Sequence, residues 1–123
     1  MEKISTIIID DERLARQDLV FLLKDIPEVV VQGEADNITD AVELVSAKKP
    51  DLILLDIRLA RENGFDLLKK IPTHIKVIFV TAYAEYALKA YEVNAMDFLL
   101  KPVDPKRLKL ALGKMMEGDS SGR

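Results

Sequence analysis

Acidic, hydroxyl and amine side chains stand directly after four short apolar runs in this chain. Asp10 and Asp11 follow residues 7–9, and Asp56 follows residues 52–55. Thr81 follows residues 78–80, and Lys101 with Pro102 follows residues 98–100. Short apolar runs are typical of buried strands in a parallel α/β sheet, and such sheets bind ligands beyond the carboxyl ends of their strands. Three carboxylates, a hydroxyl and an ammonium would then meet at one edge, where they could hold a divalent cation beside a phosphoryl group.

Each of these signals has a structural explanation when it is taken alone. The acidic pair could cap a following helix, with Asp11 as the capping residue, and Asp56 could be an ordinary loop acid. Thr81 could simply be a β-branched strand end, and Lys101 a solvated lysine. We favour the functional interpretation because four consecutive strand ends of matching chemistry would rarely coincide in a purely structural domain.

The elements that would position these groups follow from hydrophobic periodicity. We expect strands at residues 4–9, 29–35, 51–55, 76–80 and 97–100. We expect helices from near residue 12 to Pro27, from the cap Asn37 towards Pro50, at residues 65–71 and 85–92, and from the cap Asp104 onwards. Five βα units with right-handed crossovers predict an α/β fold, a doubly wound five-stranded parallel sheet of order 2-1-3-4-5.

Helix-period spacing predicts which side chains of three of these helices face the core. They are Ala15, Leu19, Leu22, Leu23 and Ile26 in the first, Ile38, Ala41, Val42 and Val45 in the second, and Leu108, Ala111, Leu112 and Met115 in the last.

The expected strand order brings the three carboxylates together. The first and third strands are neighbours, so Asp10, Asp11 and Asp56 should lie within several ångströms of one another. Two carboxylates about 4 Å apart repel by roughly 4 kcal/mol at an effective dielectric constant near 20, so a cation should accompany them. Hard oxygen ligands without a neighbouring His or Cys favour Mg²⁺.

Composition limits the remaining possibilities. The length of 123 residues suits one domain, which we place at residues 1–117, with the small polar residues 118–123 as a linker or terminal tail. The absence of cysteine excludes disulfides, thiolate nucleophiles and zinc–thiolate sites. A net charge of −3 gives no field that would attract nucleic acid or an anionic membrane. With neither a secretory leader nor an 18-residue apolar stretch, we expect a cytoplasmic protein without a membrane partner.

Taken together, these motifs resemble the receiver domain of bacterial two-component response regulators over about residues 3–117. The resemblance lies in the acidic pair, in Asp56 with Gly64 eight residues on, in Thr81-Ala82 and in Lys101-Pro102. Within that family, residues 10–16 and 81–102 resemble the LytTR-type (LytR/AlgR) regulators. The resemblance implies a flavodoxin-like receiver fold and a phosphoprotein of phosphorelay signal transduction.

The family also implies an output. LytTR-type regulators control transcription through a DNA-binding domain that follows the receiver, so this domain itself is not expected to contact nucleic acid. We expect the chain to be a receiver excised from such a regulator rather than a stand-alone one. It would accept phosphate and dephosphorylate itself without turning over a separate substrate.

The resemblance further implies a role for each acid. Asp56 would be the phosphoacceptor, taking its phosphoryl group from a sensor histidine kinase. Asp11, Asp56 and the carbonyl of Arg58 would ligate Mg²⁺ directly, and Asp10 would act through water.

The other motif residues would serve charge balance and switching. Lys101, aimed by a cis Lys101–Pro102 bond, would face the phosphoryl group from the side opposite Mg²⁺, and the small Ala82 would leave room for the hydroxyl of Thr81 to reach it. Phe98 stands where the family often has tyrosine, so the switch here would be a packing event. Phe98 could instead remain a static core residue.

Two features depart from or vary the family pattern. Ala60 replaces a usual proline, which we expect to loosen the loop after Asp56. Arg58 and Tyr83, at positions that tune dephosphorylation in the family, are both large, and we hypothesise that they shield the acyl phosphate from water. Arg58 could equally be a solvated loop cation.

A mixed apolar and charged face could support a homodimer, as in the family, through the helix at residues 85–92, the strand at residues 97–100 and the helix that starts at Asp104. Its residues would be Tyr86, Leu88, Lys89, Tyr91, Glu92, Arg107 and Lys114. The alternative is a pair of solvated helices. His74 has no acid or cysteine at ligand spacing and is expected to be a solvated loop histidine.

Three other classes of protein remain as alternatives. A haloacid-dehalogenase-type phosphatase needs a second acid two residues after its nucleophile, where this chain has Arg58. A flavodoxin-like FMN protein needs a glycine- and hydroxyl-rich phosphate loop, where this chain has the acidic residues 10–12. A phosphorylation-independent scaffold would keep the fold but ignore Mg²⁺ and phosphodonors.

Overall fold

The computed structural model describes residues 3–120 of the chain, with side chains as far as residue 116. In chain order its elements are β1 (Ile4–Ile9), α1 (Arg13–Leu23), β2 (Val29–Ala35), α2 (Ile38–Lys48), β3 (Leu52–Leu55), β4 (Arg58–Leu59), β5 (Glu62–Asn63), η1 (Gly64–Lys70), β6 (Lys76–Thr81), η2 (Ala84–Tyr86), α3 (Ala87–Glu92), β7 (Asp97–Leu100) and α4 (Pro105–Ser120). Within these residues, no helix is both long enough and apolar enough to cross a membrane.

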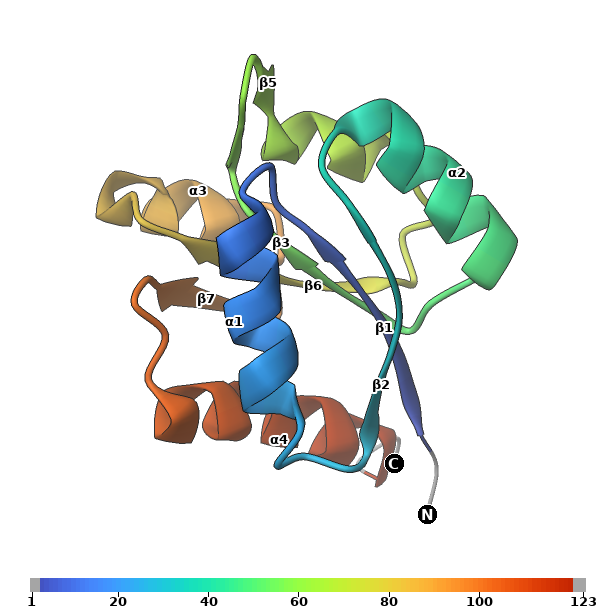
Figure 1. Ribbon diagram of the computed structural model, residues 1–123, viewed down its shortest axis with the longest axis vertical. Helices are drawn as coiled ribbons and strands as arrows, with labels where there is room; N and C mark the ends of the chain where they lie inside the picture. The colour runs from blue at the N-terminus through green and yellow to red at the C-terminus, as the bar shows by residue number, and fades with distance from the viewer. Residues whose placement is uncertain (1–2, 121–123) are drawn as a thin grey trace.

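The main sheet has the predicted topology. Its five strands lie in the order β2-β1-β3-β6-β7, and every neighbouring pair is parallel. Figure 1 shows α1 and α4 on one side of this sheet and α2, η1 and α3 on the other. The doubly wound fold is therefore confirmed, and all five parallel strands end at the same edge of the sheet.

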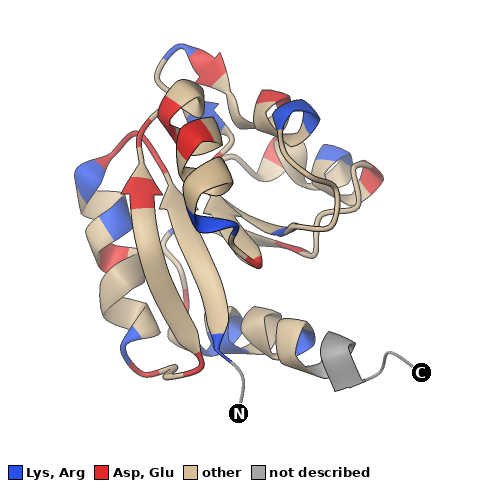
Figure 2. Cartoon of the chain, turned by 90° about the vertical axis from the view of Figure 1, so that its right-hand side faces the viewer, with Lys and Arg blue, Asp and Glu red and all other residues tan. Residues whose placement is uncertain are grey.

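The two faces of the sheet pack into two separate cores. On one face, Ile7 and Ile9 contact the buried side chains of α2 and η1. On the other, Ile8 contacts those of α1 and α4, because successive side chains of a strand point to opposite faces. In Figure 2 the strands are almost entirely free of charge, and charged residues lie mainly on helices, loops and strand ends. Strands buried on both faces explain the continuous apolar runs of the sequence.

The predicted core faces of the helices are largely confirmed. The residues in these two cores include Leu19, Leu23, Ile26, Ile38, Ala41, Val45, Leu108, Ala111, Leu112 and Met115. Helix α4 continues to Ser120, past the domain boundary that we placed at residue 117. Residues 121–123 of the expected tail lie outside the described residues.

Three local features differ from the prediction. The first helix ends at Leu23 rather than at Pro27, because the N–H of Lys24 turns to the carbonyl of Phe21 and closes a tighter turn. The segment after Gly64 is a 3₁₀ helix, opened by a hydrogen bond from the N–H of Phe65 to the side chain of Asn63. The strands β4 and β5, which pair as an antiparallel hairpin, were not predicted.

An ion-pair cluster ties β7 to α4. Arg107 donates to both carboxylate oxygens of Asp97, at 2.6 and 2.9 Å, and Lys114 donates to one of them at 2.8 Å. Burial alone would raise the pKa of Asp97, but the hydrogen bonds from these two cations outweigh it and lower the pKa to about 2. The hydrogen bond that Arg107 donates to Asp97 raises the pKa of Arg107.

Asp97→Asn should therefore destabilise the fold in a pH-dependent way. Because the folded-state pKa lies below the ordinary value of 3.8, the stabilisation is complete above about pH 4 and is lost as the pH falls towards 2. We expect a loss of about 1 to 2 kcal/mol at neutral pH, since one pKa unit is worth about 1.4 kcal/mol and the two cations are partly exposed.

Urea unfolding of both proteins between pH 2 and pH 7 measures this difference. The matched control is Asp66→Asn, which removes the carboxylate of an exposed pair with Lys69 and should change little. A loss that is the same at every pH would contradict the assignment.

Candidate functional site

Three carboxylates converge at the carboxyl ends of β1 and β3. Asp10 continues the ladder of β1 by donating its N–H to Ala35, and Asp56 continues that of β3 by donating to Ile9. One oxygen each of Asp10, Asp11 and Asp56 lies within 4.8 Å of the other two. Asp10 and Asp56 are buried and Asp11 is exposed. The strand order thus produces the predicted acidic cluster, with one acid open to solvent.

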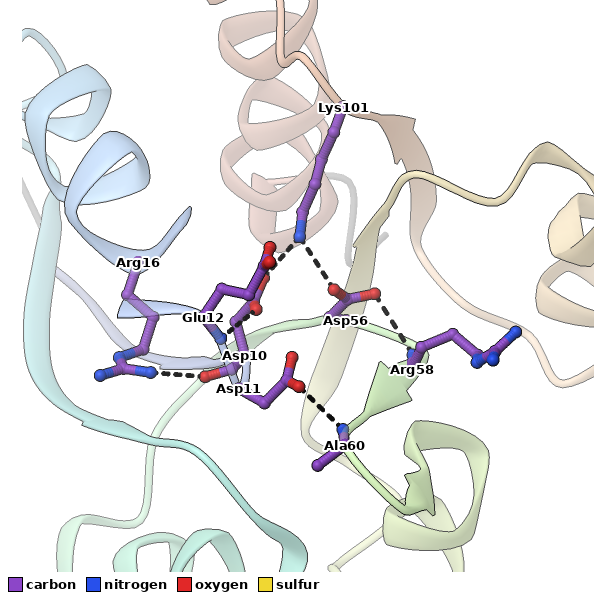
Figure 3. Close-up of polar contacts among 8 residues, drawn as sticks. All are labelled: Asp10, Asp11, Glu12, Arg16, Asp56, Arg58, Ala60 and Lys101. Atoms are coloured by element: carbon purple, nitrogen blue, oxygen red, sulfur yellow. Dashed lines mark hydrogen bonds and ion pairs between the residues drawn. The ribbon is translucent and has the colours of Figure 1, made fainter. Parts of the chain in front are cut away.

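The ammonium of Lys101 lies between two of these carboxylates. Its Nζ is 2.8 Å from an oxygen of Asp10 and 2.8 Å from an oxygen of Asp56. Figure 3 shows the side chain reaching from the end of β7 to both acids. The cation that we expected beside the acids is therefore supplied in part by the protein itself.

Burial and ion pairing act against each other in this cluster. Burial raises the pKa of Asp10, although the hydrogen bond from Lys101 opposes the increase. Burial alone would lower the pKa of Lys101, but hydrogen bonds to Asp10 and Asp56 and their negative charges outweigh it and raise the pKa. The ammonium is thus held in its charged form beside the two acids.

Each of the three carboxylates also accepts a backbone N–H. Asp10 accepts from Glu12 at 2.9 Å, Asp56 from Arg58 at 3.3 Å and Asp11 from Ala60 at 2.8 Å. The alternative that Asp11 caps the first helix is therefore wrong, because Glu12 is the N-cap and Asp11 points to the hairpin instead.

The hairpin β4–β5 is tied to its surroundings rather than loosened by Ala60. Ala60 adopts a left-handed φ of 51°, which the proline ring could not reach, and its N–H binds Asp11. Glu62 accepts a hydrogen bond from the N–H of Ile38, at the start of α2. The expectation of a loose loop is corrected by these contacts, since a proline here would lose both the conformation and the donor.

Thr81 is completely buried at the end of β6. Its Oγ1 has no hydrogen-bond partner among the residues that the structure describes. A buried hydroxyl without a hydrogen-bond partner costs free energy. The Thr81 hydroxyl is therefore suited to bind a ligand that enters the site from solvent. The predicted Lys101–Pro102 bond is cis, and Phe98 is half-buried against the core on the α2 face.

Arg58 lies beside the cluster with its side chain turned outward, as Figure 3 shows. Its guanidinium stacks over Tyr83, 4.8 Å from the centroid of the ring. Arg58 is exposed, as the alternative of a solvated loop cation predicted, and this contact gives its cation an aromatic partner. His74 is exposed, as predicted.

Two contributors to the site were missed from the sequence. Arg16 donates to the carbonyl of Asp10, and Glu62 holds the hairpin to α2. The sequence did hold a signal for Arg16, because this residue shares a helix face with the buried Leu19 and Leu23. A cation on that face points towards the core and needs a polar partner there. No local pattern indicates the partner of Glu62, which lies 24 residues away.

The donor set fits a magnesium ion. Mg²⁺ prefers oxygen ligands, keeps several waters and binds through one or two carboxylates in sites that also hold phosphate. Asp10, Asp11 and Asp56 supply only oxygens, and the exposed Asp11 leaves solvent access for such a hydrated ion.

Comparison with known proteins finds similarity over most of the chain. The family model described as response regulator receiver domain matches residues 6–113. The sensory transduction protein LytT of Bacillus anthracis is 44% identical over 114 residues, covering 90% of this chain and 46% of that protein. LytT of Bacillus subtilis (strain 168) is 46% identical over 111 residues, covering 88% of this chain and 46% of that protein. The chain thus spans about half the length of the curated relatives that it matches.

Solved structures share the fold. The response regulatory domain of protein mrkE from Klebsiella pneumoniae matches with a TM-score of 0.83 and 32% identity, covering 93% of this chain and 96% of that one. The signal receiver domain of the putative response regulator NarL from Mycobacterium tuberculosis matches with a TM-score of 0.78 and 28% identity over the whole of both chains.

Gly64 offers a direct test of how the hairpin supports Asp56. A Cβ at this position would overlap the carbonyl oxygen of Asp56 and lie 3.1 Å from the Cα of Ile57, and both are backbone atoms. Gly64→Ala should therefore lower the free energy of unfolding by about 1 to 3 kcal/mol, as overpacking does. Urea denaturation measures the change.

Gly113→Ala is the matched control. A Cβ there meets nothing within 4 Å, so alanine should stabilise α4 by about 0.5 to 1 kcal/mol. The two glycine-to-alanine substitutions should change the free energy of unfolding in opposite directions. A neutral Gly64→Ala would show that the backbone at Gly64 does not pack tightly against Asp56.

Proposed function

Because the chain belongs to the response regulator receiver domain family, we propose that Asp56 accepts a phosphoryl group from the phosphohistidine of a sensor histidine kinase. An oxygen of Asp56 would attack phosphorus, the P–N bond would break, and its electron pair would remain on the imidazole. The product is an acyl phosphate on Asp56. The main support is the position of this carboxylate, 2.8 Å from the Lys101 ammonium in a cluster with Asp10 and Asp11.

Transfer of a phosphoryl group depends mainly on positioning and on neutralising charge on its oxygens. Lys101 would leave Asp56 and follow the incoming oxygens, since its flexible stem carries a mobile point charge. Asp11, Asp56 and the carbonyl of Arg58 would hold Mg²⁺, with Asp10 acting through water. A magnesium ion bound there supplies positive charge against the phosphoryl oxygens.

Thr81 would report the arrival of phosphate. Its buried hydroxyl would donate a hydrogen bond to a phosphoryl oxygen and so gain the partner that the described residues do not provide. A ligand shifts a conformational equilibrium only through such a difference in interaction between two states. Movement of Thr81 would free space for Phe98, which is half-buried on the neighbouring strand. A phenyl ring has no hydroxyl, so this step would be one of packing alone.

The output would lie on the face formed by α3, β7 and α4. Leu88 and Tyr91 are 69% and 81% exposed there, an apolar pair that suits a homodimer contact. Arg107 and Lys114, which we expected on the same face, already bind Asp97 within the chain. A dimer contact would therefore rest mainly on Leu88 and Tyr91. Arg107 and Lys114 could bind an acid of the second copy only while they also bind Asp97. The resemblance to LytTR-type regulators leads us to propose that this output controls transcription through a LytTR-type DNA-binding domain.

Phosphorylation can be tested with a small phosphodonor. Incubation with acetyl phosphate and Mg²⁺ should add one phosphoryl group to the intact protein, seen by mass spectrometry. Asp56→Asn should abolish the addition, because an amide cannot form the acyl phosphate. Asp25→Asn, which changes an exposed acid in the turn after α1, is the control and should be modified normally. Modification of Asp56→Asn to the same extent would contradict the proposal.

The stacked Arg58 and Tyr83 would shield the acyl phosphate from water. Both side chains start beside the site, because the N–H of Arg58 donates to Asp56 and its guanidinium lies over the ring of Tyr83. We expect a phosphorylated lifetime of minutes or longer, shortened several-fold in Arg58→Ala and in Tyr83→Ala, as loss of phosphate followed by mass spectrometry would measure. Arg61→Ala removes an exposed cation of the same hairpin and should leave the lifetime unchanged. A lifetime of seconds in the unchanged protein would rule out shielding.

A further inference from the structure

Arg16 makes two contacts that no part of the proposed reaction uses. Its side chain is only 15% exposed. Its Nη1 donates to the carbonyl oxygen of Asp10 at 2.6 Å, as Figure 3 shows, and its Nε donates to the carboxylate of Glu34 at 2.9 Å. One guanidinium therefore links α1 to the ends of both β1 and β2.

The contact completes the hydrogen bonding of Asp10. The N–H of Asp10 donates to Ala35, and its two carboxylate oxygens accept from the N–H of Glu12 and from Lys101. Its carbonyl accepts from Arg16. Every polar group of this residue is thus fixed by a partner.

We propose that Arg16 is a positioning residue for the divalent-cation site, an inference that rests on the function proposed above. The carbonyl that Arg16 holds belongs to the peptide group joining Asp10 to Asp11. Fixing that peptide plane fixes the direction in which the Asp11 side chain leaves the backbone. Glu34 in turn fixes the guanidinium, whose rigid fork allows both contacts at once. Partners that orient metal ligands contribute to affinity without touching the metal.

Electrostatics alone predicts the opposite effect of removing Arg16. A cation close to the three carboxylates repels Mg²⁺, so its loss should tighten binding of the ion if charge were the whole explanation. Positioning predicts weaker binding, because Asp11 would no longer be held in place. The sign of the change therefore separates the two explanations.

The experiment titrates Mg²⁺ alone into the unmodified protein and its variants by isothermal titration calorimetry. Arg16→Gln should bind Mg²⁺ about tenfold more weakly than the unchanged protein, the lower end of the range for such orienting partners. Arg13→Gln is the matched control, since it removes the same charge from an exposed residue in the same helix turn and should bind as tightly or slightly more tightly.

Arg16→Lys keeps the charge but has no planar fork, so it should fall between the unchanged protein and Arg16→Gln. Heteronuclear NMR spectra test whether each variant is folded. If Arg16→Gln is unfolded, the Mg²⁺ affinity of Arg16→Lys is compared with that of Arg13→Gln instead. Equal or tighter binding in the Arg16 variants would overturn the positioning role alone. Failure of the unchanged protein to bind Mg²⁺ would overturn both this role and the cation site on which the proposed function depends.

Discussion

The arrangement of this site depends on one ammonium group between two buried carboxylates. The Nζ of Lys101 lies 2.8 Å from a carboxylate oxygen of Asp10 and 2.8 Å from one of Asp56. The three residues follow three different strands. Because β6 lies between β3 and β7, the lysine side chain extends past the strand end that carries Thr81. Without the ammonium, two carboxylates about 4 Å apart would repel by roughly 4 kcal/mol at an effective dielectric constant near 20. The same charge that stabilises the resting site is available to a phosphoryl group.

Backbone groups of the surrounding loops also hold the acids in place. The N–H groups of residues 12, 58 and 60 each donate to one carboxylate. Two further contacts hold these loops, one from Arg16 to the Asp10 carbonyl and one from the N–H of Ile38 to Glu62. A rigid frame of this kind costs little reorganisation when charge is transferred, which is what electrostatic stabilisation requires.

Much of the fold and the positions of the acids could be predicted from the sequence. The strands at residues 4–9, 29–35 and 97–100 match the prediction at both ends, because turn and cap residues such as Pro27, Asn37 and Pro102 stand close to their ends. The β4–β5 hairpin could not be predicted, since two-residue strands have no readable period and its conformation depends on Asp11 and Glu62. The partners of Arg16 were missed because they lie just after β1 and on β2, away from its own helix.

The most direct test of the central interaction is the pH dependence of stability in Lys101→Met. Methionine preserves much of the side-chain length but leaves Asp10 and Asp56 without their shared cation, so the buried Asp10 should take up a proton more readily when folded. The pKa of Asp10 in the folded state, which burial already raises, would rise further above the unfolded value, and stability would then fall as the pH increases. The account predicts a loss of unfolding free energy that is small near pH 4 and grows towards pH 8. A loss that does not change with pH, or no loss at all, would show that the ammonium does not hold the acids together.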